Sequence, residues 1–202
     1  LKTPLAALHG VAERLRDRGA EGDAETIDEL AREMSERIDH QLRLSVLHQR
    51  TGLHAESTPL NSAVLRTLAV LKKTGRGEDL HWMVELNNDC KVDLHRQDLL
   101  ELVGIVLENA AKWARSAVSI AVRPHGGEAI LAVEDDGPGI EEEQLPSLGK
   151  RGVRLDETKP GSGLGLAMAA EILELNGGSI GYERAGAGGL RVSLRLPLAR
   201  PA

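Results

Sequence analysis

The spacing of apolar residues changes once along this chain of 202 residues, near residue 52. Before that point, apolar residues recur at helical intervals in two runs, and the polar stretch 18–23, which holds two glycines, separates the runs. Beyond residue 58, runs with helical spacing mix with runs that alternate like strands. The sequence therefore predicts an antiparallel helical hairpin over residues 1–52 and an α+β domain over residues 58–202.

Each helix of the predicted hairpin has one apolar stripe. Two helices alone cannot bury both stripes. A second copy of the hairpin would cover them in a four-helix bundle, and twofold assemblies of identical chains are the commonest kind. We therefore expect a homodimer that forms through the hairpin.

Charge and cysteine content exclude several classes of protein. The net charge is −6 and Lys and Arg do not cluster, which argues against nucleic acid as a partner. Cys90 is the only cysteine, which excludes an internal disulfide and a multi-cysteine zinc site and fits a reducing compartment. No apolar run approaches the roughly 20 residues of a membrane helix. We expect a cytoplasmic chain whose membrane attachment, if any, lies upstream of Leu1.

The region after residue 58 alternates irregularly between helical and extended patterns. Helices are predicted over 61–73, 97–113 and 164–175, and strands over 80–86, 117–122, 129–133, 179–184 and 190–196. The segment GRGED at 75–79 and residues 124–127 are typical of turns. Residues 141–161 are polar, contain two prolines and have no steady period, which predicts a long functional loop. We expect an α/β sandwich with a mostly antiparallel sheet under one layer of helices.

Two glycine-rich segments could contact a ligand. Asp135 follows an apolar strand and begins DDGPGI, in which glycines allow close approach of the backbone, although such a turn alone is more often structural. The segment GSGLGL at 161–166 opens a helix, whose uncovered amides and dipole suit a phosphate. A dinucleotide-binding fold would need a parallel strand directly before these glycines, so that fold is disfavoured.

Two further segments lie on predicted helices. In LENAAKW, Glu108, Asn109 and Lys112 can share one side of a helix and offer an oxygen ligand for Mg²⁺ and a cation for phosphate. An isolated pattern of this kind is more typical of a solvated helix face. In LKTPL at residues 1–5, the proline bends or begins a helix.

The four segments together, in this order, resemble the sensor histidine kinases of two-component systems. LKTPL is similar to the end of the H box, LENAAKW to the N box, DDGPGI to the G1 box and GSGLGLA to the G2 box. The short segment RGVRLDETKPGSGLGL resembles the PhoQ-type branch. The resemblance implies the sandwich of the histidine-kinase, gyrase and Hsp90 ATPases. It also implies a kinase that binds Mg·ATP, phosphorylates a hairpin histidine and passes the phosphoryl group to an aspartate of a response-regulator receiver domain.

The resemblance gives the N-box residues roles around the metal and the phosphates. Asn109 would coordinate Mg²⁺, and Glu108 would be a catalytic carboxylate that polarises water or lies near the metal. Lys112 would contact phosphate. Trp113 would stack near adenine, and the alternative is a simple core tryptophan.

The resemblance also places the adenine and the lid. Asp135 would accept a hydrogen bond from the adenine amino group, in a turn shaped by Gly137 and Gly139. In the lid, Arg151 would reach the γ-phosphate, whereas Lys150 and Arg154 are either further phosphate ligands or solvated charges. The hinge and phosphate-binding positions would be Gly161, Ser162, Gly163, Leu164 and Gly165.

The family's phosphate acceptor is a histidine followed by an acidic residue and LKTPL, so it would lie just before Leu1. His9 is ten places beyond that position, about 1,000° of helix rotation away, and is expected to be a surface residue. Thr3 matches the residue that helps to orient water when the regulator is dephosphorylated. The chain has no Phe for the family's F box, and Leu148 is the nearest substitute.

Two other functions remain as alternatives. A gyrase-, mismatch-repair- or Hsp90-like ATPase would share the nucleotide site, but LKTPL and the hairpin speak against it. A regulator-binding phosphatase or scaffold without kinase activity would have lost its ligand residues, and all four boxes retain them. The kinase interpretation predicts the cytoplasmic portion of an inner-membrane sensor.

Overall fold

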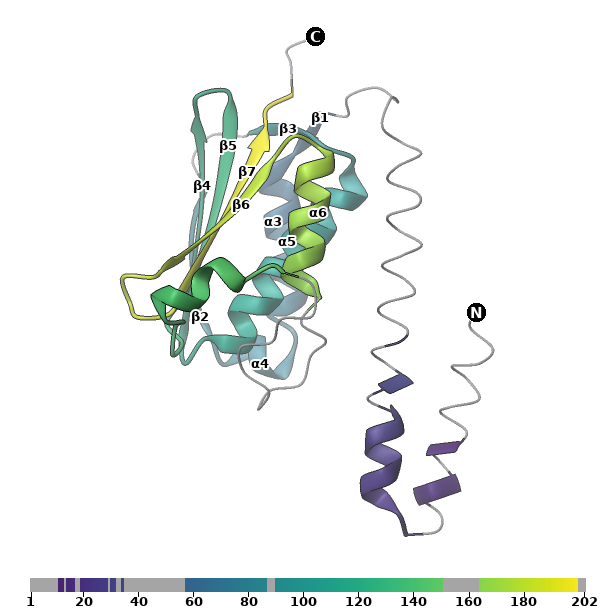
Figure 1. Ribbon diagram of the computed structural model, residues 1–202. Coiled ribbons are helices and arrows are strands. Elements are labelled where there is room, and N and C mark those ends of the chain that lie inside the picture. The colour runs from purple at the N-terminus through teal and green to yellow at the C-terminus, as the bar shows by residue number, and fades with distance from the viewer. Residues whose placement is uncertain are drawn as a thin grey trace.

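The computed structural model describes residues 11–12, 14–16, 19–28, 30–31, 34, 57–86, 90–150 and 164–199. From residue 57 onward, helices and strands follow one another in the order shown in Figure 1. They are β1 (Ser57–Pro59), α3 (Leu60–Leu71), α4 (Gly75–Glu78), β2 (His81–Leu86), β3 (Lys91–Asp93), α5 (Arg96–Trp113), β4 (Ala117–His125), β5 (Glu128–Asp135), the 3₁₀ helix η1 (Glu142–Ser147), α6 (Gly165–Leu175), β6 (Ser179–Arg184) and β7 (Leu190–Pro197).

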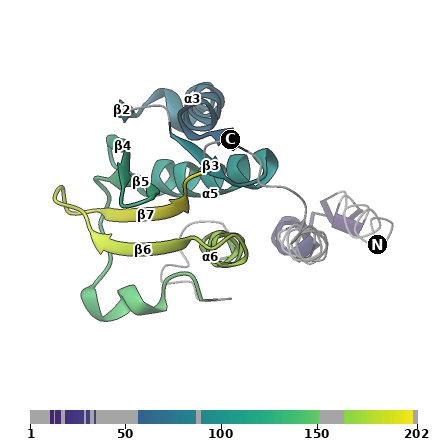
Figure 2. The ribbon, with the colours of Figure 1, turned by 90° about the horizontal axis from the view of Figure 1, so that it is seen from above.

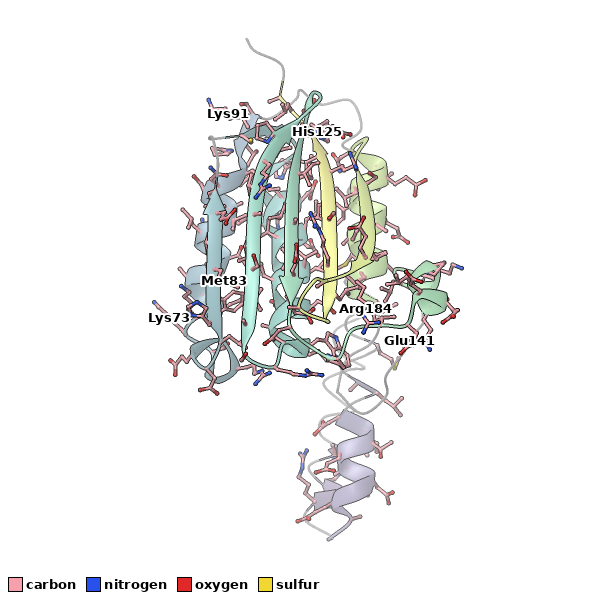
Figure 3. All side chains as sticks on the ribbon, turned by 90° about the vertical axis from the view of Figure 1, so that its left-hand side faces the viewer. Lys73, Met83, Lys91, His125, Glu141 and Arg184 are labelled. Carbon is pink, nitrogen blue, oxygen red and sulfur yellow. The ribbon has the colours of Figure 1, made fainter. Side chains whose placement is uncertain are left out.

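The main sheet has five strands in the order β2-β4-β5-β7-β6. All neighbours are antiparallel except β2 and β4, which run parallel because the chain crosses back through β3 and α5 between them. The helices α3, α5 and α6 cover one face (Figure 2), and Figure 3 looks onto the opposite face, over which no described helix lies. The predicted α/β sandwich with one helical layer is therefore confirmed, and its sheet is mixed.

The core lies between the sheet and α5, the central helix. Buried residues recur along α5 at helical spacing, among them Leu99, Leu102 and Val106, which are fully buried. Alternate residues of β4 and β5 point to the same side, so that Ile120 and Leu131 are also fully buried. Because the chain has no Phe, aliphatic side chains fill this layer, and α5 packs between α3 and α6 over β5.

The predicted hairpin turn is confirmed between β4 and β5. Its two central residues are Gly126 and Gly127, with φ angles of 57° and 91°. Both angles are positive, as the commonest two-residue hairpin turn requires. The strands therefore extend further toward the turn than their apolar alternation predicted.

Four short elements were not predicted, namely α4, β1, β3 and η1. The segment predicted as a turn at 75–79 forms α4, because the Thr74 hydroxyl accepts a hydrogen bond from Gly77 N at 3.1 Å and caps the helix. The chain enters the predicted α+β domain through β1, which pairs with β3 in a separate two-stranded sheet. The predicted loop 141–161 contains η1 in its described part.

The described residues before 35 are helical on both sides of Gly19, whose φ is 79°. Arg16 and Asp28 form an ion pair across this turn. Most of the predicted hairpin lies outside the described residues, so the hairpin as a whole and its dimer stay predictions. Among the helices that the structure describes, none has the length and hydropathy needed to cross a bilayer.

Candidate functional site

A buried carboxylate ends the central strand β5. Asp135 is its last residue, and only 3% of its surface is exposed. Its Oδ1 accepts hydrogen bonds from Gly137 N at 2.8 Å and from Leu190 N at 3.4 Å. A carboxylate that is buried and bonded to the backbone is held in one orientation, which suits recognition of a ligand's polar edge.

Glycines let three backbone segments meet at Asp135. A Cβ on Gly137 would lie 2.5 Å from the Trp113 carbonyl oxygen, so a larger residue would push the turn off the end of α5. Gly139 has a φ of +74°, and a Cβ there would lie 2.2 Å from the Gly188 carbonyl oxygen. A Cβ on Gly189 would lie 2.0 Å from the Asp135 carbonyl oxygen. Gly137 and Gly139 were predicted, whereas Gly189 was assigned only to a turn between two strands.

The last turns of α5 border this glycine-rich turn. Glu108 is exposed, and Asn109, Lys112 and Trp113 are partly buried. The Lys112 Nζ lies 5.0 Å from the centre of the Trp113 ring, a cation–π contact. The structure thus places the backbone of Trp113 beside the Asp135 turn, and the Trp113 side chain is partly exposed.

Asp136, the second aspartate of DDGPGI, binds the segment that follows α5. Its Oδ1 accepts from Arg115 N at 2.8 Å and from Ser116 N at 3.0 Å, and its Oδ2 accepts from the Ser116 hydroxyl at 2.6 Å. Partial burial raises the pKa of the Asp136 carboxyl, but hydrogen bonds from Ser116, Ala117 and Arg115 outweigh it and hold the pKa well below its usual range. Sequence reasoning missed this residue, because one aspartate in a turn has no local signal for a distant partner.

The first turn of α6 packs against α5. Gly165 begins α6, and a Cβ on it would lie 3.5 Å from the Ile105 side chain of α5. Leu164 stands at the N-cap position, and its apolar side chain makes no capping hydrogen bond to α6. Lys150 is exposed at the end of a described segment. The other predicted lid and hairpin residues lie outside the described residues, namely Thr3, His9, Arg151, Arg154, Gly161, Ser162 and Gly163.

The loop after the Asp135 turn lies against the edge strand β6. Leu148, the predicted F-box substitute, is partly buried against the core. Gly149 has a φ of +73°, and a Cβ on it would lie 2.5 Å from the Tyr182 hydroxyl. That hydroxyl is buried without a hydrogen-bond partner among the described residues, and burial raises the pKa of Tyr182 to about 12.

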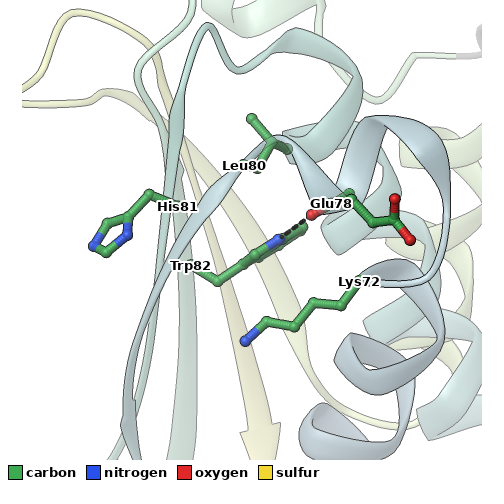
Figure 4. Close-up of a pocket in the computed structure, with 6 residues that line it drawn as sticks. Lys72, Glu78, Leu80, His81 and Trp82 are labelled. Atoms are coloured by element: carbon green, nitrogen blue, oxygen red, sulfur yellow. Dashed lines mark hydrogen bonds between the residues drawn. The ribbon is translucent and has the colours of Figure 1, made fainter.

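An open surface pocket lies elsewhere, between α3, α4 and β2 (Figure 4). Lys72, Glu78 and His81 are on its rim, and the Trp82 Nε1 donates to the Gly77 carbonyl at 2.9 Å. None of its lining residues belongs to the predicted nucleotide site. We therefore base the site on the Asp135 turn and not on this pocket.

Few of the described side chains near Asp135 could bind the predicted Mg²⁺. Within the described ranges, no three or more His, Cys, Asp or Glu side chains are grouped as an ion cage would need. Asn109 offers one amide oxygen and Glu108 an exposed carboxylate on the same turn of α5. One or two protein oxygens fit Mg²⁺, which usually keeps water and substrate phosphates among its ligands.

The chain is similar to known ATPases and sensor kinases. The family described as histidine kinase-, DNA gyrase B- and HSP90-like ATPase matches residues 95–200. Sensor protein kinase CarS of Pseudomonas aeruginosa is 36% identical over 98% of the chain, which covers 44% of CarS. Sensor protein PhoQ of Escherichia coli K12 is 30% identical over 96% of the chain, which covers 40% of that protein. The chain thus spans less than half the length of these relatives.

Solved structures show the same fold. A mycobacterial sensor histidine kinase, MprB, superposes with a TM-score of 0.66 at 27% identity, over 73% of this chain and 100% of MprB. The histidine kinase AdeS of Acinetobacter baumannii superposes with a TM-score of 0.68 over 99% of this chain and 98% of AdeS. The identity to AdeS is 21%, so that likeness concerns the fold alone.

Proposed function

Because the chain belongs to the histidine kinase-, DNA gyrase B- and HSP90-like ATPase family and is similar to PhoQ-like sensor kinases, we propose that it is the catalytic core of a sensor histidine kinase. In this proposal it binds Mg·ATP and transfers the γ-phosphoryl group to a histidine on the hairpin, just before Leu1. The phosphoryl group then passes to an aspartate of a response-regulator receiver domain. The observation that supports this most directly is the buried, backbone-bonded carboxylate of Asp135 beside the end of α5.

Asp135 selects the base in this mechanism. A carboxylate only accepts hydrogen bonds, so it pairs with the amino group of adenine and repels the carbonyl oxygen that guanine has at the same position. The bonds from Gly137 N and Leu190 N keep the carboxylate from turning away. Trp113 adds a ring surface on which the base can stack.

The end of α5 binds the phosphates. Asn109 and Glu108 would hold Mg²⁺ together with the phosphate oxygens, and the ion supplies neutralisation of the charge that builds up on them. Lys112 adds a cation on the same side of the helix. Its contact with Trp113 limits the directions in which its ammonium group can point.

We propose that the lid, the predicted loop 141–161, covers the opposite side of the phosphates. We propose that Arg151 contacts the γ-phosphate, that Lys150 assists it, and that the glycines at 161, 163 and 165 let amides at the start of α6 approach. Ser162 and Leu164 would contribute backbone amides to the same cradle. Catalysis then comes mainly from position and charge neutralisation, because phosphoryl transfer needs little covalent work from the protein.

The partners follow from the hairpin. We propose that it forms the homodimer, presents the histidine and binds the response regulator, with Thr3 orienting water when the regulator is dephosphorylated. The chain would be the cytoplasmic portion of an inner-membrane sensor. The names of its relatives describe sensor proteins, and the chain spans 40–44% of their length.

Calorimetry with Mg·ATP and Mg·GTP tests the nucleotide site. We expect the chain to prefer ATP by about a hundredfold or more, and Asp135→Ala to lower ATP affinity at least about tenfold. Glu134→Gln is the matched control: Glu134 precedes Asp135, and its partly exposed side chain pairs with Arg191, 3.4 Å away. Equal binding of ATP and GTP, or full ATP affinity in Asp135→Ala, would contradict the proposal.

Radiolabelled ATP tests phosphotransfer. A longer chain that includes the residues before Leu1 should become labelled, with the acid-labile, base-stable behaviour of phosphohistidine. Replacement of the acceptor histidine by Gln should abolish the label without changing nucleotide affinity. Steady release of phosphate without any labelled protein would instead favour a related ATPase.

A further inference from the structure

The C-terminal end of α5 is held by a residue from another helix. Carbonyls in the last turn of a helix have no partner inside it. Arg76 of α4 supplies donors there: its Nε donates to the Ala111 carbonyl at 3.3 Å, and its Nη2 donates to the Ala114 carbonyl. A cation at this position also interacts favourably with the helix dipole.

Arg76 is itself positioned by tight backbone packing. Gly77, the next residue, is buried, and a Cβ on it would lie 1.8 Å from the Leu71 carbonyl oxygen at the end of α3. Thr74 caps α4, and the Trp82 indole of β2 donates to the Gly77 carbonyl at 2.9 Å. The end of α3 and strand β2 therefore determine where the Arg76 guanidinium lies.

Asp136 holds the same end of α5 from the other side. It accepts three hydrogen bonds of 2.6–3.0 Å from Arg115 and Ser116, the second and third residues after α5. Its own amide donates to the Ala117 carbonyl at 3.3 Å. Since Asp136 directly follows Asp135, these bonds join the segment after α5 to the turn that presents the buried carboxylate.

We propose that Arg76 and Asp136 are positioning residues that together fix the last turn of α5, with Asn109, Lys112 and Trp113, against the Asp135 turn before any nucleotide binds. Neither residue needs to touch the nucleotide. Preorganisation of this kind strengthens binding, because the ligand does not have to order its own site. The expected effect on nucleotide binding rests on the proposed function, whereas the attachment of Arg76 and Asp136 to the end of α5 rests on the hydrogen bonds above.

Hydrogen exchange of the nucleotide-free chain tests the geometry without any ligand. In Asp136→Ala and in Arg76→Gln, amides of residues 108–117 should exchange at least about tenfold faster, because the end of α5 then opens locally. Amides of β6 and β7 should keep their wild-type rates. Unchanged exchange over 108–117, or equal acceleration throughout the sheet, would overturn the inference.

Calorimetry of the same variants tests the consequence. Asp136→Ala should weaken Mg·ATP binding about tenfold. Asp136→Asn should recover most of that loss, because its amide oxygen can still accept from Arg115 N and Ser116 N. Arg76→Gln should behave like Asp136→Ala. Arg76→Lys should recover only part of the affinity, because lysine keeps the positive charge but cannot donate to two carbonyls in the fixed geometry of a guanidinium group.

Two further variants keep the test decisive. Ser116→Ala removes one hydrogen bond at the surface, so it should fold even where Asp136→Ala does not, and it should lose a smaller part of the affinity. Glu134→Gln should leave both affinity and exchange over 108–117 unchanged. A wild-type chain that binds no nucleotide would contradict the proposed function. Faster exchange confined to 108–117 in the variants would still support the inference that Arg76 and Asp136 fix the end of α5. Full affinity in all the Arg76 and Asp136 variants would overturn it.

Discussion

The two sides of the proposed nucleotide site are held together differently. On the α5 side, charged side chains bond to backbone groups: Asp135 to Gly137, and Asp136 to Arg115 and Ser116. On the side formed by η1 and residues 148–150, the contacts that the described residues make with the core and with Tyr182 are apolar or steric, and the buried Tyr182 hydroxyl has no partner among those residues. Directional bonds hold one register, whereas apolar contacts can slide at little cost. We therefore expect the α5 side, which would recognise the base, to keep its register more firmly than η1 and residues 148–150.

The largest effect that this comparison predicts is at Gly189, where the β6–β7 turn touches Asp135. Gly189→Ala would place a Cβ 2.0 Å from the Asp135 carbonyl oxygen, and we expect it to lower the free energy of unfolding by about 3 kcal/mol. The control is Gly186→Ala, in the same turn, whose Cβ would meet nothing within 4 Å. Urea unfolding of both variants measures the difference. Similar stabilities would mean that the α5 side is less tightly fixed than we argue.

A smaller effect is predicted at Gly149, on the opposite side. Gly149→Ala should cost about 1–2 kcal/mol, because an L-residue disfavours its φ of +73° and the new methyl group would meet the Tyr182 hydroxyl. In a Tyr182→Phe background the steric part of this cost should disappear, so a double-mutant cycle should give a favourable coupling energy. Strict additivity would show that the hydroxyl does not confine this loop.

Tyr182 also permits an optical test of that side. It is the only tyrosine in the chain, so absorbance at 295 nm reports its ionisation alone. Burial raises its pKa to about 12, so the midpoint should lie near 12 and not near the ordinary value of about 10. The stabilisation that comes from keeping the neutral phenol is complete below about pH 10, and it is lost as the pH rises through 12. A midpoint near 10 would mean that the hydroxyl is solvated.

The smallest effect concerns the acid stability of the α5 side. The pKa of Asp136 lies below its unfolded value, so its carboxylate stabilises the fold fully above about pH 4 and less as the pH falls below that value. Because the group is partly exposed, we expect about 1 kcal/mol or less. The difference in the free energy of unfolding between the wild type and Asp136→Asn, measured in urea at pH 6 and pH 3, should shrink toward acid. If the difference is the same at both pH values, the stabilisation does not come from the charge of the Asp136 carboxylate.

Local pattern predicted most of the fold. Apolar periodicity and turn signals located α3, α5, α6 and the five strands of the main sheet to within a few residues, and most of these elements bury one face. It could not predict α4, which depends on one capping bond and on packing against the end of α3. Nor could it predict that β1 pairs with β3, because the alignment of two three-residue strands has no period to read.

The site divides in the same way. Asp135, Gly137, Gly139 and Trp113 belong to recognisable motifs, and the structure brings their backbones together. Arg76 contacts Ala111, 35 positions further along the chain, and Gly189 contacts Asp135, 54 positions before it. No short motif records contacts of that separation, so only the folded chain reveals them. The roles of the lid residues and of Thr3 stay predictions.

The contact between Gly189 and Asp135 affects the stage of synthesis at which the proposed nucleotide site can form. Among the described residues, the β6–β7 hairpin is synthesised after all the other elements, yet its turn and the amide of Leu190 complete the surroundings of a carboxylate that was synthesised more than fifty residues earlier. A nascent chain that has emerged only as far as α6 would already have α5 and Asp135, but not the complete surroundings of the proposed adenine site. If the proposed site binds ATP, retention on immobilised ATP would therefore select chains whose synthesis and folding have both reached β7.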